Sequence, residues 1–495
     1  MGVAYPERVA DLTLVCPPAG VAPSVRLASA QGRWLLLATI LGSGLASVDA
    51  TVVNVALPAI GHDLAMGFAG LQWTLTAYTL TLASFILIGG SAGDRLGRRR
   101  IFIAGVVWFA AASLLCAVAP TGALLIAARA VQGIGAALAT PASLAIIQAT
   151  YAEADRARAV GTWAGFSGVA SALGPFLGGW LIEAGSWRLV FLINLPLAAL
   201  VVWLCVVHVP ETRDPAATGR LDLPGALAGA VGLGGISYAL ISAPASGAFS
   251  VRVLLSVALG LVGLVAFAAI ERRGRNPMVP PRVFASPQFR AVNAVTLLVY
   301  GGIGASLFLL VIELQVASGF SPVVAGSALL PITLIVLVFS GRSGDLASRI
   351  GPRAQMTAGP VLLGLATLLG LRLGIHSGYV TDVLPLVVAF GCGLAIMVAP
   401  LTSAALAAVP VEHAGIASGV NNAVARAGQL LAVAAIPAAA GITGTAYADP
   451  SAFLAAFHTT TWTCAILFFT AAVLAATTVR PSEHPARRES PPESA

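Results

Sequence analysis

Long apolar blocks recur along almost the whole chain, and they constrain its fold more than any other feature. Stretches of about 18 or more apolar residues are typical of membrane-spanning helices, and one such block runs from Ile101 to Ala119. Within lipid, only helices and closed barrels satisfy their backbone hydrogen bonds. Barrel strands are shorter, at about 10 residues, and they alternate in polarity. The blocks do neither, so we predict an all-α polytopic membrane protein.

Charged residues are too scarce for a water-soluble protein of this size. They make up 9% of the 495 residues, whereas 58% are hydrophobic. Soluble domains carry about 25% charged residues. The apolar blocks predict fourteen spans, at 34–58, 71–92, 101–119, 122–149, 160–182, 189–209, 222–243, 252–270, 291–316, 323–341, 355–374, 382–409, 414–440 and 458–479.

The arginines predict how these spans are oriented. All 27 basic residues are arginine, and 22 of them lie in the tails or in loops on the same side as the tails. Three lie on the other side and two, Arg129 and Arg426, lie inside spans. Positive residues are enriched in cytoplasmic loops, so we predict that both termini are cytoplasmic in a bacterial inner membrane. Because the charge follows the loops, it does not indicate nucleic-acid binding.

A sequence repeat predicts two halves. Gly90 and Asp94 follow span 2, and Gly341 and Asp345 follow span 10. Two six-helix halves would place the second copy after span 8, so spans 7 and 8 are predicted to be an insertion. Internal repeats are the usual construction of secondary transporters. The predicted parts are a cytoplasmic N-terminal tail 1–33, a six-helix bundle 34–209, a linker with two inserted helices 210–290, a six-helix bundle 291–480 and a cytoplasmic tail 481–495.

The loop after span 2 contains an ordered set of small and charged residues: Gly90, Asp94, Arg95, Gly97 and Arg98. Charged side chains beside helix ends interact with the exposed backbone groups there. We predict that this set forms a gate latch that breaks and re-forms between two conformations. An ordinary positively charged cytoplasmic loop is the alternative.

This set resembles the loop motif of the major facilitator superfamily. The stretch from Val48 to Pro58 and the residues Arg129, Gln132, Gly133 and Gly135 are similar to motifs of its fourteen-span drug:proton antiporter family. The resemblance implies a major facilitator fold of two six-helix bundles plus two inserted helices, acting as a monomer. One departure is that Arg426 stands in span 13, where many relatives carry an acid. A span 5 set resembles a motif of antiporters and comprises Gly165, Gly174, Pro175, Gly178 and Gly179.

The span 5 set has a physical reading of its own. Pro175 removes a backbone donor and favours a kink, and Gly178 and Gly179 offer a flat face for close packing. We predict a hinge or seal between the halves, with plain helix packing as the alternative.

Asp49 in span 1 and Arg129 in span 4 are the candidates for proton coupling. A charge inside a span costs about 2.5–3.5 kcal/mol on insertion scales and is a functional candidate by default. Helix geometry places Asp49 roughly 14 Å and Arg129 roughly 10 Å from the outer ends of their spans. Burial favours a protonated carboxyl group, whereas a nearby cation favours the carboxylate. A change in their separation would therefore switch proton binding. A static ion pair is the alternative.

Glu313 and Arg426 form a candidate second coupling or substrate site in the later half. Glu313 is predicted near the outer end of span 9, where simple hydration is the alternative to a proton or cation site. Arg426 is predicted near mid-membrane and needs a carbonyl, a carboxylate or an anionic substrate as its partner. Aromatic residues within spans, such as Tyr78 and Tyr300, are candidates to line a cavity for apolar ligands.

We therefore expect an antiporter, not an enzyme, that exports small organic compounds, amphipathic or cationic, in exchange for protons. The expected partners are this cargo, protons and the lipid bilayer, and no cofactor or metal is needed because the proton gradient drives transport. An exporter dedicated to one metabolite or self-made antibiotic is the alternative. A nutrient importer or uniporter fits the span 5 motif less well. A channel or membrane enzyme is disfavoured by the repeat and by the lack of a catalytic set of residues.

Overall fold

The structure is a computed structural model that describes residues 25–214, 221–274, 279, 281–410, 414–442, 444, 447 and 449–480. The tail 481–495 and residues 1–24 lie outside this part of the chain. The described residues form helices and no β-strand, which confirms the predicted fold class.

The helices are α1 (Ala30–Asp63), α2 (Phe68–Leu96), α3 (Arg98–Ala117), α4 (Gly122–Thr150), α5 (Glu153–Ala184), α6 (Leu189–Leu192), α7 (Asn194–His208), α8 (Leu223–Ser246), α9 (Val251–Arg273), α10 (Pro287–Val316), α11 (Pro322–Ser327), α12 (Leu330–Ile350), α13 (Pro352–Leu368), α14 (Leu384–Ala407), α15 (Ala414–Ala439) and α16 (Pro450–Thr478).

Each predicted span coincides with one helix or with a consecutive pair such as α6 and α7. Thirteen helical segments of the described chain are long and apolar enough to cross a membrane. The predicted span not among these thirteen is span 13, which corresponds to α15, a helix of 26 residues that contains Arg426. The structure therefore has the helices that a polytopic membrane protein needs.

Side-chain caps determine where several of these helices begin. Ser29 and Thr121 accept hydrogen bonds from the free backbone amides of α1 and α4, as capping residues do. Asp449 caps α16, and backbone amides of Ala452 and Ser451 together with the Ser451 hydroxyl hold the pKa of its carboxyl group below the ordinary value. The helix starts are thus encoded locally.

The repeat residues lie differently from the prediction. Helix α2 continues through the motif to Leu96, so that Gly90, Asp94 and Arg95 lie on its last turns and not in a loop. It ends at Gly97, whose φ of 114° is a conformation that favours glycine. Helix α12 likewise ends at Gly351, with a φ of 83°. The sequence placed the end of span 2 too early because the charged residues of the motif were read as a loop.

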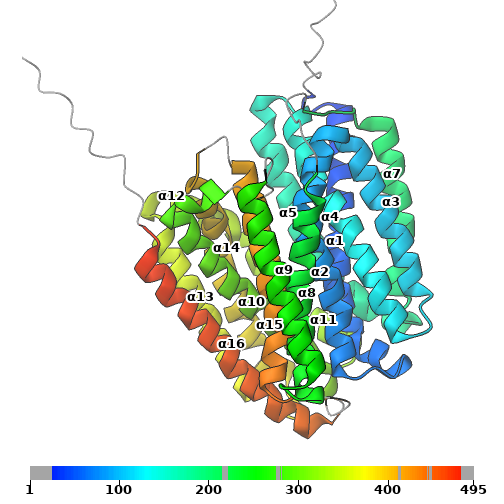
Figure 1. The fold of residues 1–495 in the computed structure, drawn as a ribbon, viewed down its shortest axis with the longest axis vertical. Coiled ribbons are helices and arrows are strands. Elements are labelled where there is room, and N and C mark those ends of the chain that lie inside the picture. The colour runs from blue at the N-terminus through cyan, green and yellow to red at the C-terminus, as the bar shows by residue number, and fades with distance from the viewer. Residues whose placement is uncertain are drawn as a thin grey trace, which may run out of the picture.

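Figure 1 shows two groups of helices that are closest at the end opposite the termini and spread apart toward the termini. One group contains α1–α5 and α7, and the other contains α10, α12–α14 and α16, with α15 packed on α10. Helix α8 packs against α9, α2 and α15, so it lies where the two groups meet. The exact division into two bundles and a linker stays a prediction.

Helix α5 contacts both groups through its glycines. A Cβ atom at Gly174 or Gly178 would overlap residues of α1, namely Thr51 or Val52. A Cβ atom at Gly179 would overlap the backbone of α11 at Pro322 and Val323. Small residues permit such close backbone approach in membrane helices. Gly174, Gly178 and Gly179 therefore allow α5 to pack closely against α1 and α11.

Contacts between the groups are made toward the end opposite the termini. Gln72 of α2 donates to the Val433 carbonyl oxygen at 2.7 Å, and the Val323 amide of α11 donates to Glu183 of α5 at 3.1 Å. Toward the termini, by contrast, a Cβ atom at Gly165 of α5 or Gly341 of α12 would meet no atom within 4 Å. The contacts at Gln72 and Glu183 thus join the two groups at the end opposite the termini, where the ribbons lie closest (Figure 1).

A Gly179→Leu substitution should disfavour this conformation. The new side chain cannot fit against the α11 backbone, so α5 and α11 must separate. We expect longer distances between spin labels at positions 184 and 324, measured by double electron–electron resonance.

Gly165→Leu is the matched control, because its side chain enters open space in this conformation. We expect it to leave the α5–α11 distance unchanged. An unchanged distance in Gly179→Leu would contradict the proposed role of this close contact.

Candidate functional site

Asp49 and Arg129 form an ion pair that is fully buried. The side chains of both residues are 0% exposed, and Arg129 Nη1 lies 2.5 Å from Asp49 Oδ2. The structure thus brings together the two residues that the sequence placed at similar depth. Removing one partner of a buried ion pair typically costs about 3–5 kcal/mol, so each charge depends on the other.

Three further polar side chains complete the surroundings of Asp49. Its second oxygen, Oδ1, accepts hydrogen bonds from Gln132 Nε2 at 2.8 Å and from Asn194 Nδ2 at 3.2 Å. Both amide groups also donate to the Ser113 hydroxyl oxygen, at 2.7 and 3.1 Å. Helices α1, α3, α4 and α7 therefore meet at one hydrogen-bond network.

The Arg129 side chain is held on its other sides by α2. Its Nε donates to the Thr74 carbonyl oxygen at 3.1 Å, and its guanidinium carbon lies 4.3 Å from the centre of the Tyr78 ring. This is within cation–π distance. The remaining Nη2 is buried and has no hydrogen-bond partner among the described residues. Arg129 is therefore held in place by several contacts, but one of its N–H groups lacks a hydrogen-bond acceptor among the described residues.

The predicted latch residues make contacts at the α2–α3 junction. Arg98 pairs with Asp94 at 2.8 Å, and the Arg98 amide donates to the Thr212 carbonyl oxygen. The segment after α7 joins them, because the Glu211 carboxylate accepts hydrogen bonds from the amides of Arg99 and Arg100. An anion at the first turn of a helix is electrostatically favourable. A latch between the two helix groups stays a prediction.

Glu313 is buried and not exposed to solvent at the end of its span. Its side chain is 0% exposed, and Ser318 donates a hydrogen bond to its Oε1 at 2.8 Å. Its Oε2 is buried and has no hydrogen-bond partner in the described chain. The hydration alternative is therefore wrong, because α10 extends to Val316 and its neighbours cover the carboxyl group. Burial of an unpaired carboxylate is costly, so the neutral acid is favoured here.

Arg426 forms an ion pair with neither acid among the described residues. It is partly exposed, and its Nη1 donates a 3.3 Å hydrogen bond to Gln429 Oε1 on the same helix. No carboxylate forms an ion pair with Arg426 among the described residues. The structure therefore does not join Glu313 and Arg426 into one site.

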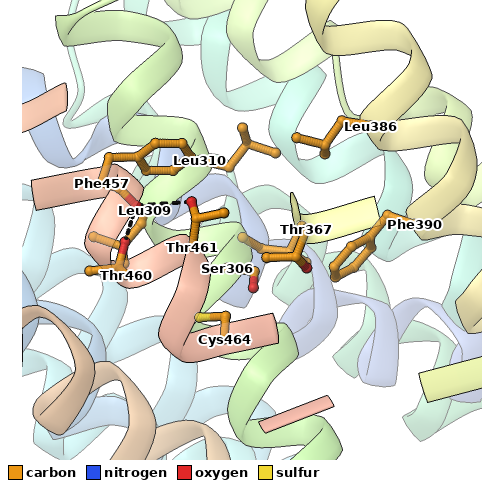
Figure 2. Close-up of a pocket in the computed structure, with 11 residues that line it drawn as sticks. Ser306, Leu309, Leu310, Thr367, Leu386, Phe390, Phe457, Thr460, Thr461 and Cys464 are labelled. Carbon is orange, nitrogen blue, oxygen red and sulfur yellow. Dashed lines mark hydrogen bonds between the residues drawn. The ribbon is translucent and has the colours of Figure 1, made fainter. Parts of the chain in front are cut away.

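A small cavity lies among α10, α13, α14 and α16 (Figure 2). Hydroxyl groups of Ser306, Thr367, Thr460 and Thr461 face it together with apolar side chains. Its volume is about 20 Å³, which is enough for one water molecule. Sites for drug-sized ligands measure roughly 300–1,000 Å³. This cavity is therefore not the place where such a cargo binds.

Sequence reasoning missed Ser113 and Glu211. Ser113 is a lone polar residue in the apolar block of span 3, which is a usable signal. Glu211 lies in the segment after α7 and has no local pattern that points to α3. Its role depends on a contact across more than a hundred residues.

Comparison with known proteins agrees with this architecture. A family model described as Major Facilitator Superfamily matches residues 39–433. The chain resembles the multidrug resistance protein Stp of Mycobacterium tuberculosis, with 38% identity over 78% of this chain and 72% of Stp. It also resembles the puromycin resistance protein pur8 of Streptomyces alboniger, with 38% identity over 83% of each chain. The probable actinorhodin transporter of Streptomyces coelicolor is 35% identical over 82% of this chain and 72% of its own length.

Solved structures share the fold at lower sequence identity. A bacterial homologue of the human lysosomal transporter Spinster, in an inward-facing and unoccupied conformation, has a TM-score of 0.64 at 18% identity, over 91% of this chain and 97% of its own. The peptide transporter POT in complex with sulfate has a TM-score of 0.63 at 16% identity, over 92% and 96% of the two chains. The match of the family model to most of the chain, the relatives above 30% identity and the shared fold lead to one conclusion: this protein is a transporter that belongs to the Major Facilitator Superfamily.

Proposed function

We propose that the protein is a proton-coupled antiporter that exports drugs or antibiotics from a bacterial cell by alternating access. The observation that carries this proposal is the fully buried Asp49–Arg129 pair, since intramembrane ionisable residues mark ion and proton pathways. The names of the relatives, which refer to multidrug and puromycin resistance, support export of such compounds. The proton gradient supplies the energy, so no cofactor takes part.

Proton binding to Asp49 would couple to the conformation through Arg129. In the present conformation Arg129, Gln132 and Asn194 all donate to the carboxylate. A proton on Asp49 removes its charge and leaves Arg129 as a buried, uncompensated cation, which is strongly unfavourable. The helices that hold these groups must then rearrange or admit water. Release of the proton restores the pair, so each proton drives one change of state.

Orientation follows from the arginines. With both termini cytoplasmic, as their distribution favours, the end at which the helix groups spread apart faces the cytoplasm in this conformation (Figure 1). The cargo then enters from the inside or from the inner leaflet. Separation of α5 from α11 opens the other side, while the α2–α3 junction with Asp94 and Arg98 closes against the second group.

An exporter dedicated to one antibiotic is the second candidate. The observation in its favour is that several relatives carry the name of a single compound, namely puromycin, methylenomycin A or actinorhodin. Both candidates share the coupling mechanism. They differ only in how many compounds the site accepts, which a panel of compounds tested in the same liposomes would reveal.

Replacing Asp49 with asparagine should uncouple transport. The amide keeps the size of the side chain but cannot carry the proton. In proteoliposomes we expect pH-gradient-driven transport to fall by about a hundredfold or more, which is the lower end of the range for loss of one acid–base group. Counterflow of labelled cargo, which needs no gradient, should persist and report that the variant is folded.

Asp63→Asn is the matched control, because Asp63 also pairs with an arginine, Arg188, but at an exposed helix end. It should keep gradient-driven transport. If Asp49→Asn transports as fast as the wild type under a pH gradient, Asp49 is not the coupling site.

We further propose that Glu313 is a second proton site. It is buried and has no cation beside it among the described residues, whereas Asp49 is ion-paired with Arg129, so a proton on Glu313 would not leave a buried cation unpaired. Glu313→Gln imitates the neutral form and should fold normally. We expect it to lower the number of protons exchanged per cargo molecule, measured as the pH gradient at which net flux stops for a fixed cargo gradient. Glu153→Gln, at the exposed start of α5, should leave that ratio unchanged, and an unchanged ratio in Glu313→Gln would assign Glu313 a structural role.

A further inference from the structure

Arg426 places a positive charge where the two helix groups meet. It lies on α15, which packs against α10 and α16 on one side and against α2 and α8 on the other. Its neighbours Gly428 and Gln429 lie against Gly301 and Gly304, on the turn of α10 that follows Tyr300. Helix α2, which carries Tyr78, also packs against α15. Tyr78 in turn lies under Arg129. Arg426 is therefore on a helix that joins the two groups and packs against α2, which holds part of the coupling network.

The protein leaves most of the bonding capacity of Arg426 unused. A guanidinium group has five N–H donors. Among the described residues it has one side-chain partner, the Gln429 amide oxygen, which is a neutral acceptor at the long distance of 3.3 Å. The side chain is partly exposed, in contrast to Arg129, which is 0% exposed and ion-paired. An accessible cation with free donors is suited to binding a ligand.

Neither buried acid can neutralise this charge. Asp49 already accepts hydrogen bonds from Arg129, Gln132 and Asn194. Glu313 lies thirteen residues after Tyr300 on α10, which is roughly 20 Å along the helix, and its Oε1 accepts from Ser318. The neighbourhood of Arg426 therefore keeps a net positive charge within the described part of the chain.

We propose that Arg426, together with Gln429 and Tyr300, binds an anionic group of the exported compound. This inference rests on the proposed export function and narrows the amphipathic cargo to compounds that carry a carboxylate or an acidic phenol. Arginine binds carboxylates through two parallel N–H···O bonds, and the Gln429 amide and the Tyr300 hydroxyl supply further polar contacts. The rings of Tyr78 and Tyr300 provide apolar surface for the rest of the molecule.

A bound anion would also offset the energetic cost of placing Arg426 inside a span. A free cation in the membrane is costly, and a bound carboxylate offsets that cost only while the cargo is present. The empty and loaded carriers therefore differ in local charge by one unit. Cargo binding would therefore change the electrostatic environment of Tyr78 and, through contact with that ring, of Arg129.

The test measures binding to the full-length protein in lipid nanodiscs, without any gradient. The probes are aromatic dyes and drugs, each offered as the free carboxylic acid and as its methyl ester, for example a rhodamine with a free carboxylate and the ester of the same dye. Fluorescence polarisation gives the two dissociation constants. We expect the wild type to prefer the free acid, and Arg426→Gln to lower that preference about tenfold, as for the loss of one charge-assisted contact. Arg426→Lys should keep part of it.

Arg252→Gln is the matched control, since Arg252 is an exposed arginine at the start of α9, and it should keep the full preference. The inference is overturned if the wild type does not bind the acids more tightly than the esters, or if Arg426→Gln weakens both forms alike. Failure of the proposed export function appears elsewhere, as the absence of pH-gradient-driven flux of any tested compound in wild-type proteoliposomes. The two results can therefore be told apart.

Discussion

The buried pair between Asp49 and Arg129 is the interaction on which the arrangement of the first helix group depends. It joins α1 to α4, and the amide groups that share Asp49 bring in α3 and α7 through Ser113 and Asn194. Arg129 also binds the Thr74 carbonyl oxygen of α2. A polar network is an expensive way to join helices in lipid, because any unsatisfied member costs several kcal/mol. Its presence in an otherwise apolar bundle is best explained by a change of protonation.

Glycine contacts decide where the two helix groups can approach each other. Helix α5 lies against α1 at Gly174 and Gly178 and against α11 at Gly179, while its half toward the termini faces open space. Close packing at one end and openness at the other are what an alternating-access carrier needs in one of its two states. The polar contact between Glu183 and Val323 is weak enough to break in each cycle.

The charged residues inside the membrane differ in their exposure and in their ion-pair partners, and we infer different roles for them from that difference. Arg129 is buried and neutralised, so it acts on Asp49. Arg426 is accessible and has no carboxylate partner in the described chain, so it is available to an external anion. Glu313 is buried and has no cation beside it among the described residues. We propose that Arg129 with Asp49 serves coupling, Arg426 recognition and Glu313 storage of a proton.

Much of the site could be read from the sequence. Asp49, Arg129, Glu313 and Arg426 stand out because any charge in an apolar block is unusual, and the helices follow from the length and pattern of those blocks. The end of α2 was misplaced, since charged residues can continue a helix into the aqueous phase. The hydration of Glu313 was a wrong alternative, because burial depends on neighbouring helices that no local pattern specifies.

The sequence by itself determined the spans, their number and the few charges within them, because these depend on local hydrophobicity. Only the tertiary structure decided which charges meet: Asp49 with Arg129, Glu211 with the start of α3, and Arg426 with neither acid. The physical reason is that an ion pair depends on the distance between side chains from distant parts of the chain. That distance is set by helix packing, which the glycines of α5 and the hydrogen-bond network around Asp49 fix together.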